Sequence, residues 1–224
     1  MYIPKQFDVT DLAVISRLIE VNPLATIVTR QGEALNANHI PLHLVDIGDP
    51  SASSSSVMPG RVLRGHVARA NPLWRDLESS DKALVVFLGV QAYISPSLYA
   101  TKKVDAKVVP TWNYEAVHIH GAIRLIQDGP GLHALMHSLT DTQERSLSHP
   151  WSVDDAPAEY IERLMSAIVG VEISIEHLEA KRKLSQNQPS ANQQSVIEGL
   201  SARQNLQDVA MADAIRGVAA KLQS

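Results

Sequence analysis

Apolar residues near the start of the chain recur with helical spacing. Over residues 8–21 they stand three or four positions apart, which predicts a helix with one apolar face. Asp8 or Thr10 can serve as its N-cap, because a short polar side chain there accepts a hydrogen bond from the first turn. The helix is expected to end at Asn22-Pro23.

Strand-like spacing follows. Residues 24–30 and 34–45 are rich in β-forming residues and are separated by a short turn with a glycine, so they predict an opening hairpin. Pro41 cannot donate a ladder hydrogen bond, and the second strand should therefore lie at an edge or bulge there. Residues 46–60, with the serine run Ser51–Ser56, are expected to form a loop, because their composition cannot build a packed element.

The next segment combines two strands with a short helix. A strand is expected over residues 61–67, and a helix over residues 71–79, with Asn71 as its N-cap and Pro72 at its first position. The continuous apolar run within residues 82–89 predicts a strand with both faces covered.

Residues 108–127 carry strand periodicity with many polar side chains. From residue 112 onward, alternation places on one face Trp112, Tyr114, Ala116, His118 and His120. A buried imidazole needs a partner, so this face is expected to line a polar cavity or a subunit interface. A half-exposed antiparallel strand with ordinary alternation is the alternative.

Helical spacing returns over residues 129–147 and 157–169, and clear alternation predicts a last strand over residues 171–184. The tail from Pro189 to Ser224 contains two weakly amphipathic helical segments. This order of elements predicts an α+β protein with a sheet or barrel core.

Composition narrows the class of protein. A chain of 224 residues that is 45% hydrophobic can bury a full core as one domain, or as a domain with a helical appendix. No apolar run could cross a bilayer and no signal-peptide pattern opens the chain, so a cytoplasmic protein without a membrane partner is expected. The absence of cysteine excludes disulfides and thiolate chemistry, and an organic cofactor fits best.

Cations gather where the strand over residues 61–67 leads into the helix start at Asn71. Arg61, Arg64, His66 and Arg69 there would suit a phosphate, although the arginines could instead point to solvent while His66 only caps. A second group of hydrogen-bonding side chains, Lys183, Ser185, Gln186 and Asn187, follows the last strand, and its alternative is a simple turn before Pro189.

Two other chemistries are disfavoured. His118 and His120 could bind a metal, but no paired carboxylate motif lies nearby, and alternation places Glu115 on the opposite face. No serine lies in a nucleophile elbow, so no hydrolytic triad is indicated. We predict neither a metal site nor a named catalytic residue.

Several separated blocks together resemble one family. They are MYIPKQF (residues 1–7), NHIPL (38–42), RGHVARANPLW (64–74), YISPSLY (93–99), VPTWNYEAVHIHG (109–121) and KLSQN (183–187). They look like the PaiB family of FMN-binding negative transcriptional regulators, which is similar to the flavin-binding split β-barrels of pyridoxamine-phosphate oxidases. The resemblance runs from Met1 to about Gln188. It departs at Arg182, where relatives often carry an aromatic residue, and at the insertion Ser51–Ser56.

The resemblance implies an antiparallel, Greek-key-like split β-barrel with peripheral helices over residues 1–188, followed by a helical tail over residues 189–224. It also implies a homodimer with FMN at the subunit interface. The residues expected to bind FMN, without assignment to its parts, are Asn38, His39, Arg64, His66, Arg69, Asn71, Tyr99, Trp112, Asn113, Tyr114, His118, Lys183, Ser185 and Gln186.

Two functions follow from the resemblance. The first is an FMN-binding repressor of transcription, and the alternative is an FMN-dependent oxidoreductase or haem-handling protein that does not bind DNA. The net charge of −4 gives no general attraction for DNA. If operator DNA is a partner, the candidate surfaces are the loop Lys102–Lys107 and the run Lys181–Lys183.

Overall fold

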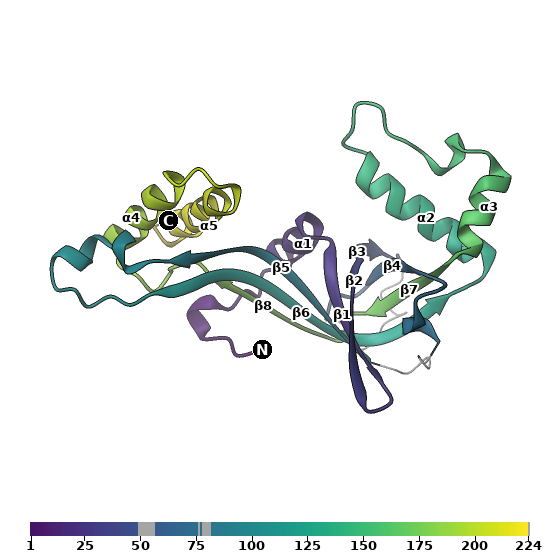
Figure 1. Cartoon of the computed structure of the whole chain (residues 1–224), viewed down its shortest axis with the longest axis horizontal. Helices are drawn as coiled ribbons and strands as arrows, with labels where there is room; N and C mark the ends of the chain where they lie inside the picture. The colour runs from purple at the N-terminus through teal and green to yellow at the C-terminus, as the bar shows by residue number, and fades with distance from the viewer. Residues whose placement is uncertain (49–56, 76, 78–81, 224) are drawn as a thin grey trace. The chain divides into compact units, whose positions relative to one another are not determined.

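The computed structural model describes residues 1–48, 57–75, 77 and 82–223. Its helices (Figure 1) are α1 (Leu12–Val21), α2 (Gly129–Glu144), α3 (Ala158–Ser166), α4 (Ser190–Ser201) and α5 (Leu206–Gln223). Its strands are β1 (Leu24–Gln31), β2 (Ala34–Pro41), β3 (His43–Asp46), β4 (Arg61–Ala68), β5 (Lys82–Ile94), β6 (Thr111–Ile126), β7 (Ile168–Ser174) and β8 (His177–Lys183). Short 3₁₀ turns are η1 (Lys5–Phe7), η3 (Pro72–Trp74), η4 (Pro96–Leu98), η5 (Ala100–Lys103) and η6 (Val153–Asp155).

The strands form one sheet in the order β2-β1-β5-β6-β7-β4-β3, and β8 also pairs with β6. The pairs β1–β2, β1–β5, β3–β4, β4–β7 and β6–β7 are all antiparallel. The predicted opening hairpin is β1–β2, and β2 lies at the end of the strand order, as Pro41 requires. An antiparallel sheet with helices around it confirms the α+β class.

The chain divides into two compact units. The first comprises Met1–Leu18, Leu88–Val117 and Glu179–Ser224, and the second comprises Ile19–Phe87 and His118–Leu178. In the second unit, α2 and α3 pack near β4 and β7 (Figure 1). In the first unit, α4 and α5 pack on each other, and α4 contacts η4 and η5. The predicted boundary between residues 1–188 and 189–224 stays a prediction.

The two tail helices share a core with the strand end and turns beside them. Buried apolar side chains come from β5 (Ala92, Ile94), from the segments after β5 and β8 (Tyr99, Leu184), from α4 (Val196, Ile197, Leu200) and from α5 (Met211, Ala212, Ile215). Burying each large aliphatic side chain stabilises the fold by about 1.5–3 kcal/mol. Gly199 permits close packing, since a Cβ there would lie 2.4 Å from Leu98 Cδ2. The tail is therefore part of the packed structure.

The alternation of side chains along β6 agrees with the prediction. The burial and polarity of its two faces do not. On the predicted polar face Trp112 is 49% exposed, His120 is exposed and His118 is half-buried. The opposite face is buried and is not wholly apolar, because it includes Asn113 and Glu115, which are 1% and 5% exposed. The most deeply buried polar side chains of this strand thus lie on the face opposite the predicted polar one.

Several predicted boundaries were wrong. The helix over residues 8–21 begins at Leu12, because the Asp11 carboxylate, rather than Asp8 or Thr10, accepts hydrogen bonds from the amides of Ala13 and Val14. The strand over residues 34–45 is β2 and β3, separated by Leu42, which is fully buried.

Two further elements also differ from the prediction. The helix at Asn71 is the single turn η3, capped as predicted by the Asn71 side chain, which accepts from the amide of Leu73 2.9 Å away. The strand over residues 82–89 extends to Ile94, and its second face is not fully covered, since Leu88 is 54% exposed. The loop over residues 46–60 and the helix end at residue 79 lie partly outside the described residues.

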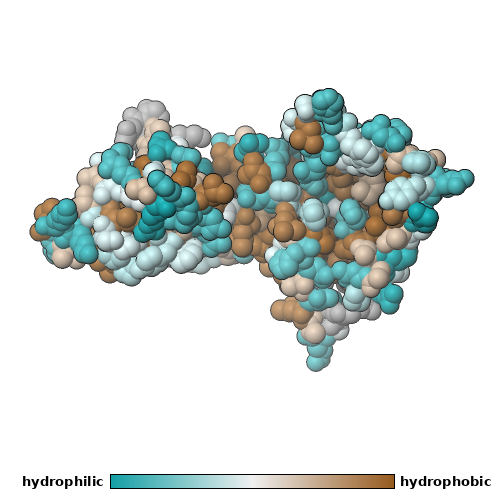
Figure 2. Space-filling view, turned by 45° about the horizontal axis from the view of Figure 1, so that its top comes forward, coloured by the Kyte–Doolittle hydropathy of each residue, from teal (hydrophilic) through white to brown (hydrophobic). Residues whose placement is uncertain are grey.

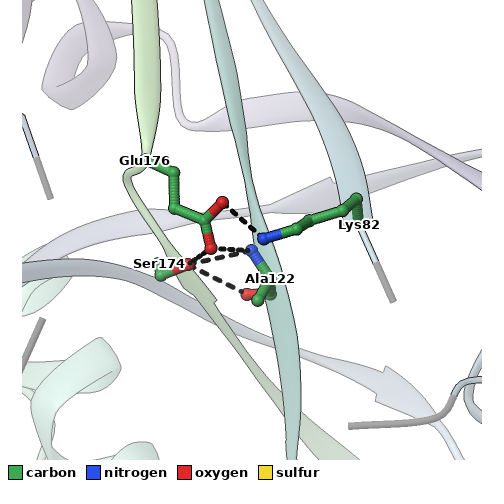
Figure 3. A network of polar contacts seen from close by, with 4 residues as sticks. All are labelled: Lys82, Ala122, Ser174 and Glu176. Carbon is green, nitrogen blue, oxygen red and sulfur yellow. Dashed lines mark hydrogen bonds and ion pairs between the residues drawn. The ribbon is translucent and has the colours of Figure 1, made fainter. Parts of the chain in front are cut away.

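The strand predicted over residues 171–184 is two strands, because polar side chains interrupt it beside Ala122 of β6 (Figure 3). The Ser174 hydroxyl lies 2.8 Å from the Ala122 amide, and the Glu176 carboxylate lies 3.3 Å from it. Glu176 also forms an ion pair with Lys82 at 2.5 Å. Gly121 lets β7 approach, since a Cβ there would lie 1.6 Å from the Ser174 carbonyl oxygen. The side chains thus replace the regular ladder where β7 ends and β8 begins.

No helix within the described ranges is both long enough and apolar enough to cross a membrane.

Replacing Glu176 with Gln should lower the free energy of unfolding at neutral pH. The variant should also lose less stability than the parent when the pH is lowered. The pKa of Glu176 lies below its usual value of 4.5, mainly because the Lys82 side chain donates to it, with help from Ser174 and the Ala122 amide. A lowered carboxyl pKa contributes stability above the ordinary pKa, and this contribution is lost as pH falls through the folded-state pKa. Since Lys82 is 62% exposed, we expect a loss of only about 0.2–1 kcal/mol near pH 7.

Urea midpoints at neutral pH and near pH 3 measure this effect. Glu33→Gln is the control, because Glu33 is exposed in the β1–β2 turn. If Glu176→Gln and the parent lost stability equally on acidification, the carboxylate would not contribute as described.

Candidate functional site

A pocket of about 360 Å³ in the first unit gathers several of the family-like sequence blocks. Its lining residues are Phe7, Tyr99, Lys107, Val108, Val109, Pro110, Thr111, Asn113, Lys183, Ser185, Asn187 and Gln188. They come from η1, the segments before β6, the start of β6, and the end of β8 with its following turn. Four residues expected to bind FMN meet here, namely Tyr99, Asn113, Lys183 and Ser185.

Asn113 is the most informative residue of this pocket. Strand alternation turns its side chain inward, and its Nδ2 donates to the Ser185 hydroxyl oxygen at 2.8 Å. Its Oδ1 is buried and has no hydrogen-bond partner among the described residues. An unpaired buried acceptor costs about 1–3 kcal/mol, so a donor from a ligand would be favoured at this position.

Ser185 is held in an unusual backbone conformation. Its φ of +62° lies in the left-handed region, which non-glycine residues seldom adopt. Gln193 of α4 supports the turn, since its Nε2 donates to the carbonyl oxygens of Ser185 (3.2 Å) and Gln188 (2.9 Å). A strained residue held by surrounding contacts is typical of a functional site.

The pocket is also cationic. Lys183 Nζ hydrogen-bonds to the Thr111 hydroxyl, and Lys107 also lines the pocket. Tyr99 is 4% exposed, and burial raises the pKa of its phenol, so the hydroxyl stays protonated at neutral pH. Ammonium and hydroxyl donors around a small pocket suit a phosphate or another compact anion.

Gln186, although predicted to bind cofactor, is not among the lining residues. Its Oε1 accepts from the amide of Leu184 at 2.7 Å, and its Nε2 donates to the carbonyl oxygen of Arg182 at 2.5 Å. Both ends of this side chain brace the turn that presents Ser185.

Sequence reasoning missed a partly buried ion pair in the first unit. The Glu115 carboxylate lies 2.6 Å from Arg182 Nε, and Gly89 leaves room for it, because a Cβ there would lie 2.8 Å from Glu115 Oε2. In the sequence, Arg182 stands out as a departure from the family pattern and as part of the basic run Lys181–Lys183. A buried carboxylate needs a cation, so an arginine at an unexpected strand position was the available signal.

Trp112 and Tyr114 lie on the other face of β6 and do not line the pocket. The rings of Trp112 and Tyr93 have centroids 6.1 Å apart, and both residues are nearly half-exposed. Tyr114 lies under Lys181, whose Nζ is 5.0 Å from the ring centroid. Apolar side chains that reach the surface can be seen as brown areas among teal ones in Figure 2.

The remaining predicted residues belong to the second unit. Asn71 Nδ2 donates to Asn38 Oδ1 at 2.9 Å, so these two residues do meet. His39 Nδ1 lies 3.0 Å from the Thr26 hydroxyl. His66 and His118 are half-buried, and burial lowers the pKa of His66. At neutral pH the His66 ring is therefore uncharged and adds no cation to this cluster.

Two of the three arginines predicted to suit a phosphate, Arg64 and Arg69, are engaged within the chain. Arg64 pairs with Glu172 at 2.7 Å, and Arg124 pairs with the same carboxylate at 2.9 Å. Arg69 donates to the carbonyl oxygens of Ser166 and Ile168 at 2.7 and 2.9 Å. An anion at this cluster would have to compete with these partners.

A model of a family described as "Putative FMN-binding domain" matches residues 1–177. The chain belongs to this FMN-binding family. The resemblance to the PaiB family is confirmed by the Bacillus subtilis protein "Protease synthase and sporulation protein PAI 2", which is 33% identical over 205 residues, covering 92% of this chain and 91% of the relative. An uncharacterized protein of Emericella nidulans is 34% identical over 229 residues, covering 89% and 90%.

Solved structures confirm the split-barrel fold predicted for the family. The FAD and heme binding protein of Mycobacterium smegmatis has a TM-score of 0.53 at 14% identity and covers 79% of this chain and 73% of its own. A conserved hypothetical protein of Mycobacterium tuberculosis has a TM-score of 0.55 at 11% identity, covering 84% and 94%. Membership of the family supports a flavin-binding protein, and the identities to these structures establish the fold alone.

Ser185→Ala should destabilise the protein more than Ser185→Gly. Both changes remove the hydroxyl and leave Asn113 Nδ2 without its acceptor, at a cost of about 1–3 kcal/mol. Glycine relieves the left-handed backbone strain, and alanine does not, so the glycine variant should be about 1 kcal/mol more stable than the alanine variant. Urea unfolding followed by tryptophan fluorescence measures both. Equal stabilities of the two variants would contradict the strain at Ser185.

Proposed function

We propose that the protein binds FMN and acts as a negative transcriptional regulator of the PaiB type. The observation that carries the flavin proposal is the Asn113 Oδ1 acceptor, which is buried without a hydrogen-bond partner in the described part of the chain, in the 360 Å³ pocket that Lys183 also lines. This volume lies at the lower end of the range for small-molecule pockets, roughly 300–1,000 Å³. Its donors suit the polar half of FMN.

Within this proposal, three of the pocket residues have chemical roles. Lys183, with the Thr111 hydroxyl, would hold the phosphate through charge-assisted contacts. Asn113 would accept a hydrogen bond from a ribityl hydroxyl. The flavin would supply redox or light-absorbing chemistry when bound. The predicted cluster around Arg69 and His66 is the competing phosphate anchor, and internal partners make it the weaker candidate.

A homodimer is proposed along with the flavin site. Its support is the exposed apolar surface of β5 and β6 in the first unit, where Leu88 is 54% exposed and Tyr93 and Trp112 are 46% and 49% exposed. Aromatic side chains of this kind are common at protein interfaces. A partner subunit covering them would remove that surface from water.

The alternative function is an FMN-dependent oxidoreductase or a haem-handling protein. The names of the fold neighbours fit it, since one is an FAD and heme binding protein and another is the flavocytochrome Anf3 of Azotobacter vinelandii, with a TM-score of 0.53. DNA binding distinguishes the two functions, because only a repressor requires it.

FMN should bind much more tightly than riboflavin, and Lys183→Met should remove most of this preference. Each charge-assisted contact contributes about 1.5–3 kcal/mol, so the variant should lose roughly 10- to 100-fold in FMN affinity while riboflavin affinity changes little. Arg69→Met tests the competing anchor, and Lys5→Met, at an exposed lysine of η1, is the control.

Flavin fluorescence titration measures these affinities, and sedimentation of the same samples should give twice the 24.4 kDa chain mass. Equal affinities of the parent protein for FMN and riboflavin would exclude phosphate anchoring at either cluster. A monomer at micromolar concentration would exclude the proposed dimer.

DNA binding, if the repressor proposal is right, should depend on the exposed lysines of η5. Lys102 and Lys103 are exposed, whereas Lys181 is 7% exposed and donates to the Tyr2 carbonyl oxygen. Arg182 is paired with Glu115, and Lys183 lines the pocket. We therefore do not propose the run Lys181–Lys183 as a DNA-binding surface.

Changing Lys102 and Lys103 to Gln should therefore weaken operator binding and reduce its salt slope by about 0.9 per lost phosphate contact, without changing flavin affinity. Lys107→Gln is compared separately, because Lys107 also lines the pocket. Operator-shift titrations at two salt concentrations measure the effect. Absence of any salt-dependent shift for the parent would favour the oxidoreductase alternative.

A further inference from the structure

A group of three metal-ligand side chains lies in the second unit, and none of the three is among the residues assigned above. Within the described part of the chain, His133, His137 and Asp154 place one ligand atom each within 4.8 Å of one another. His133 and His137 are both on α2, and Asp154 is in η6. Two histidines four positions apart lie on the same face of a helix, which is a recurrent way to hold zinc.

The geometry between His137 and Asp154 matches a metal site better than a hydrogen bond. His137 Nε2 is 3.5 Å from Asp154 Oδ1, and this buried nitrogen has no hydrogen-bond partner among the described residues. Two ligand atoms on a tetrahedral zinc, each bound at roughly 2.0–2.2 Å, lie about 3.4 Å apart. The two atoms are therefore spaced as neighbouring ligands of one ion.

His133 completes the set. Its ring centroid lies 4.5 Å from that of His137, with the planes inclined by 39°. His133 is exposed, so its side chain can turn to bring a ring nitrogen onto the ion without disturbing the core. Asp154 is 76% exposed and is presented on a fixed backbone, because Ser152 and Asp155 form a capping box around η6.

We propose that His133, His137 and Asp154 bind one divalent transition-metal ion, with zinc as the best fit. Two imidazoles and one carboxylate favour zinc and its first-row neighbours over magnesium or calcium, which prefer oxygen ligands. Three protein ligands leave a coordination position open. This position adjoins a pocket of about 930 Å³ lined by His133 and Asp154 together with Arg69 and Glu162.

The surroundings distinguish this site from a metalloprotease centre. The helix sequence from His133 to His137 is HALMH, which lacks the glutamate that serves as general base in such enzymes. The site is also separate from His118 and His120, for which no metal was predicted. The ion would instead join η6 to α2, alongside the existing bond from the Trp151 amide to Glu144 Oε2 at 3.0 Å.

Calorimetric titration of protein lacking any histidine tag with zinc chloride tests this proposal. One zinc per chain with micromolar or tighter affinity is expected. His137→Gln and Asp154→Asn should each weaken binding by at least about tenfold. His149→Gln is the matched control, because His149 is an exposed histidine on the α2–α3 connection that also carries Asp154, and its Nδ1 lies 3.1 Å from the Ser148 hydroxyl. Circular dichroism checks that each variant is folded.

Cobalt provides a second readout, since its visible absorption reports tetrahedral coordination and should disappear in His133→Gln. Affinity should also fall at acidic pH, because a protonated imidazole cannot bind the ion. Absence of binding at millimolar zinc would overturn the proposal. So would zinc binding that the three variants weaken no more than His149→Gln does. Neither result depends on flavin or DNA.

Discussion

The need to satisfy polar groups that lie inside the first unit shapes most of its structure. A buried amide, carboxylate or ammonium group without a partner costs more than a typical apolar contact contributes. The buried face of β6 nevertheless carries Asn113 and Glu115. Each draws a partner from the end of β8 or the turn after it, Ser185 for the amide and Arg182 for the carboxylate. The register between these segments is fixed by polar pairing.

This pairing explains why the pocket forms where it does. Ser185 accepts from Asn113 with its backbone in the left-handed region, and Gln186 and Gln193 donate hydrogen bonds to carbonyl oxygens of this turn. Of the two polar side-chain atoms of Asn113, the nitrogen donates to Ser185, whereas the oxygen has no hydrogen-bond partner among the residues that the structure describes. A ligand that binds in the pocket and donates a hydrogen bond to Asn113 Oδ1 would therefore complete this network.

Sequence periodicity predicted the elements well and the site only in part. Alternation identified β6 and its two faces, because the two-residue period is a property of the strand itself. It could not show that the inward face is polar, since Asn113 and Glu115 find their partners about 70 residues later in the chain. The break between β7 and β8 was missed for the same reason: Ser174 and Glu176 continue the alternation, and only contacts to Ala122 and Lys82 reveal the interruption. The family-like sequence blocks identified Tyr99, Lys183 and Ser185 as candidate site residues. They did not include His133, His137 and Asp154.

The position of Gln193 on α4 has a consequence for how this family is delimited. The family match ends at residue 177, yet Lys183, Ser185 and the helix residue that braces their turn all come afterwards. A fragment trimmed to the matched region would keep most of the sheet and lose one wall of the pocket. Genome surveys that align only the matched region would then group proteins by a shared scaffold, while a segment that lines the pocket goes uncompared.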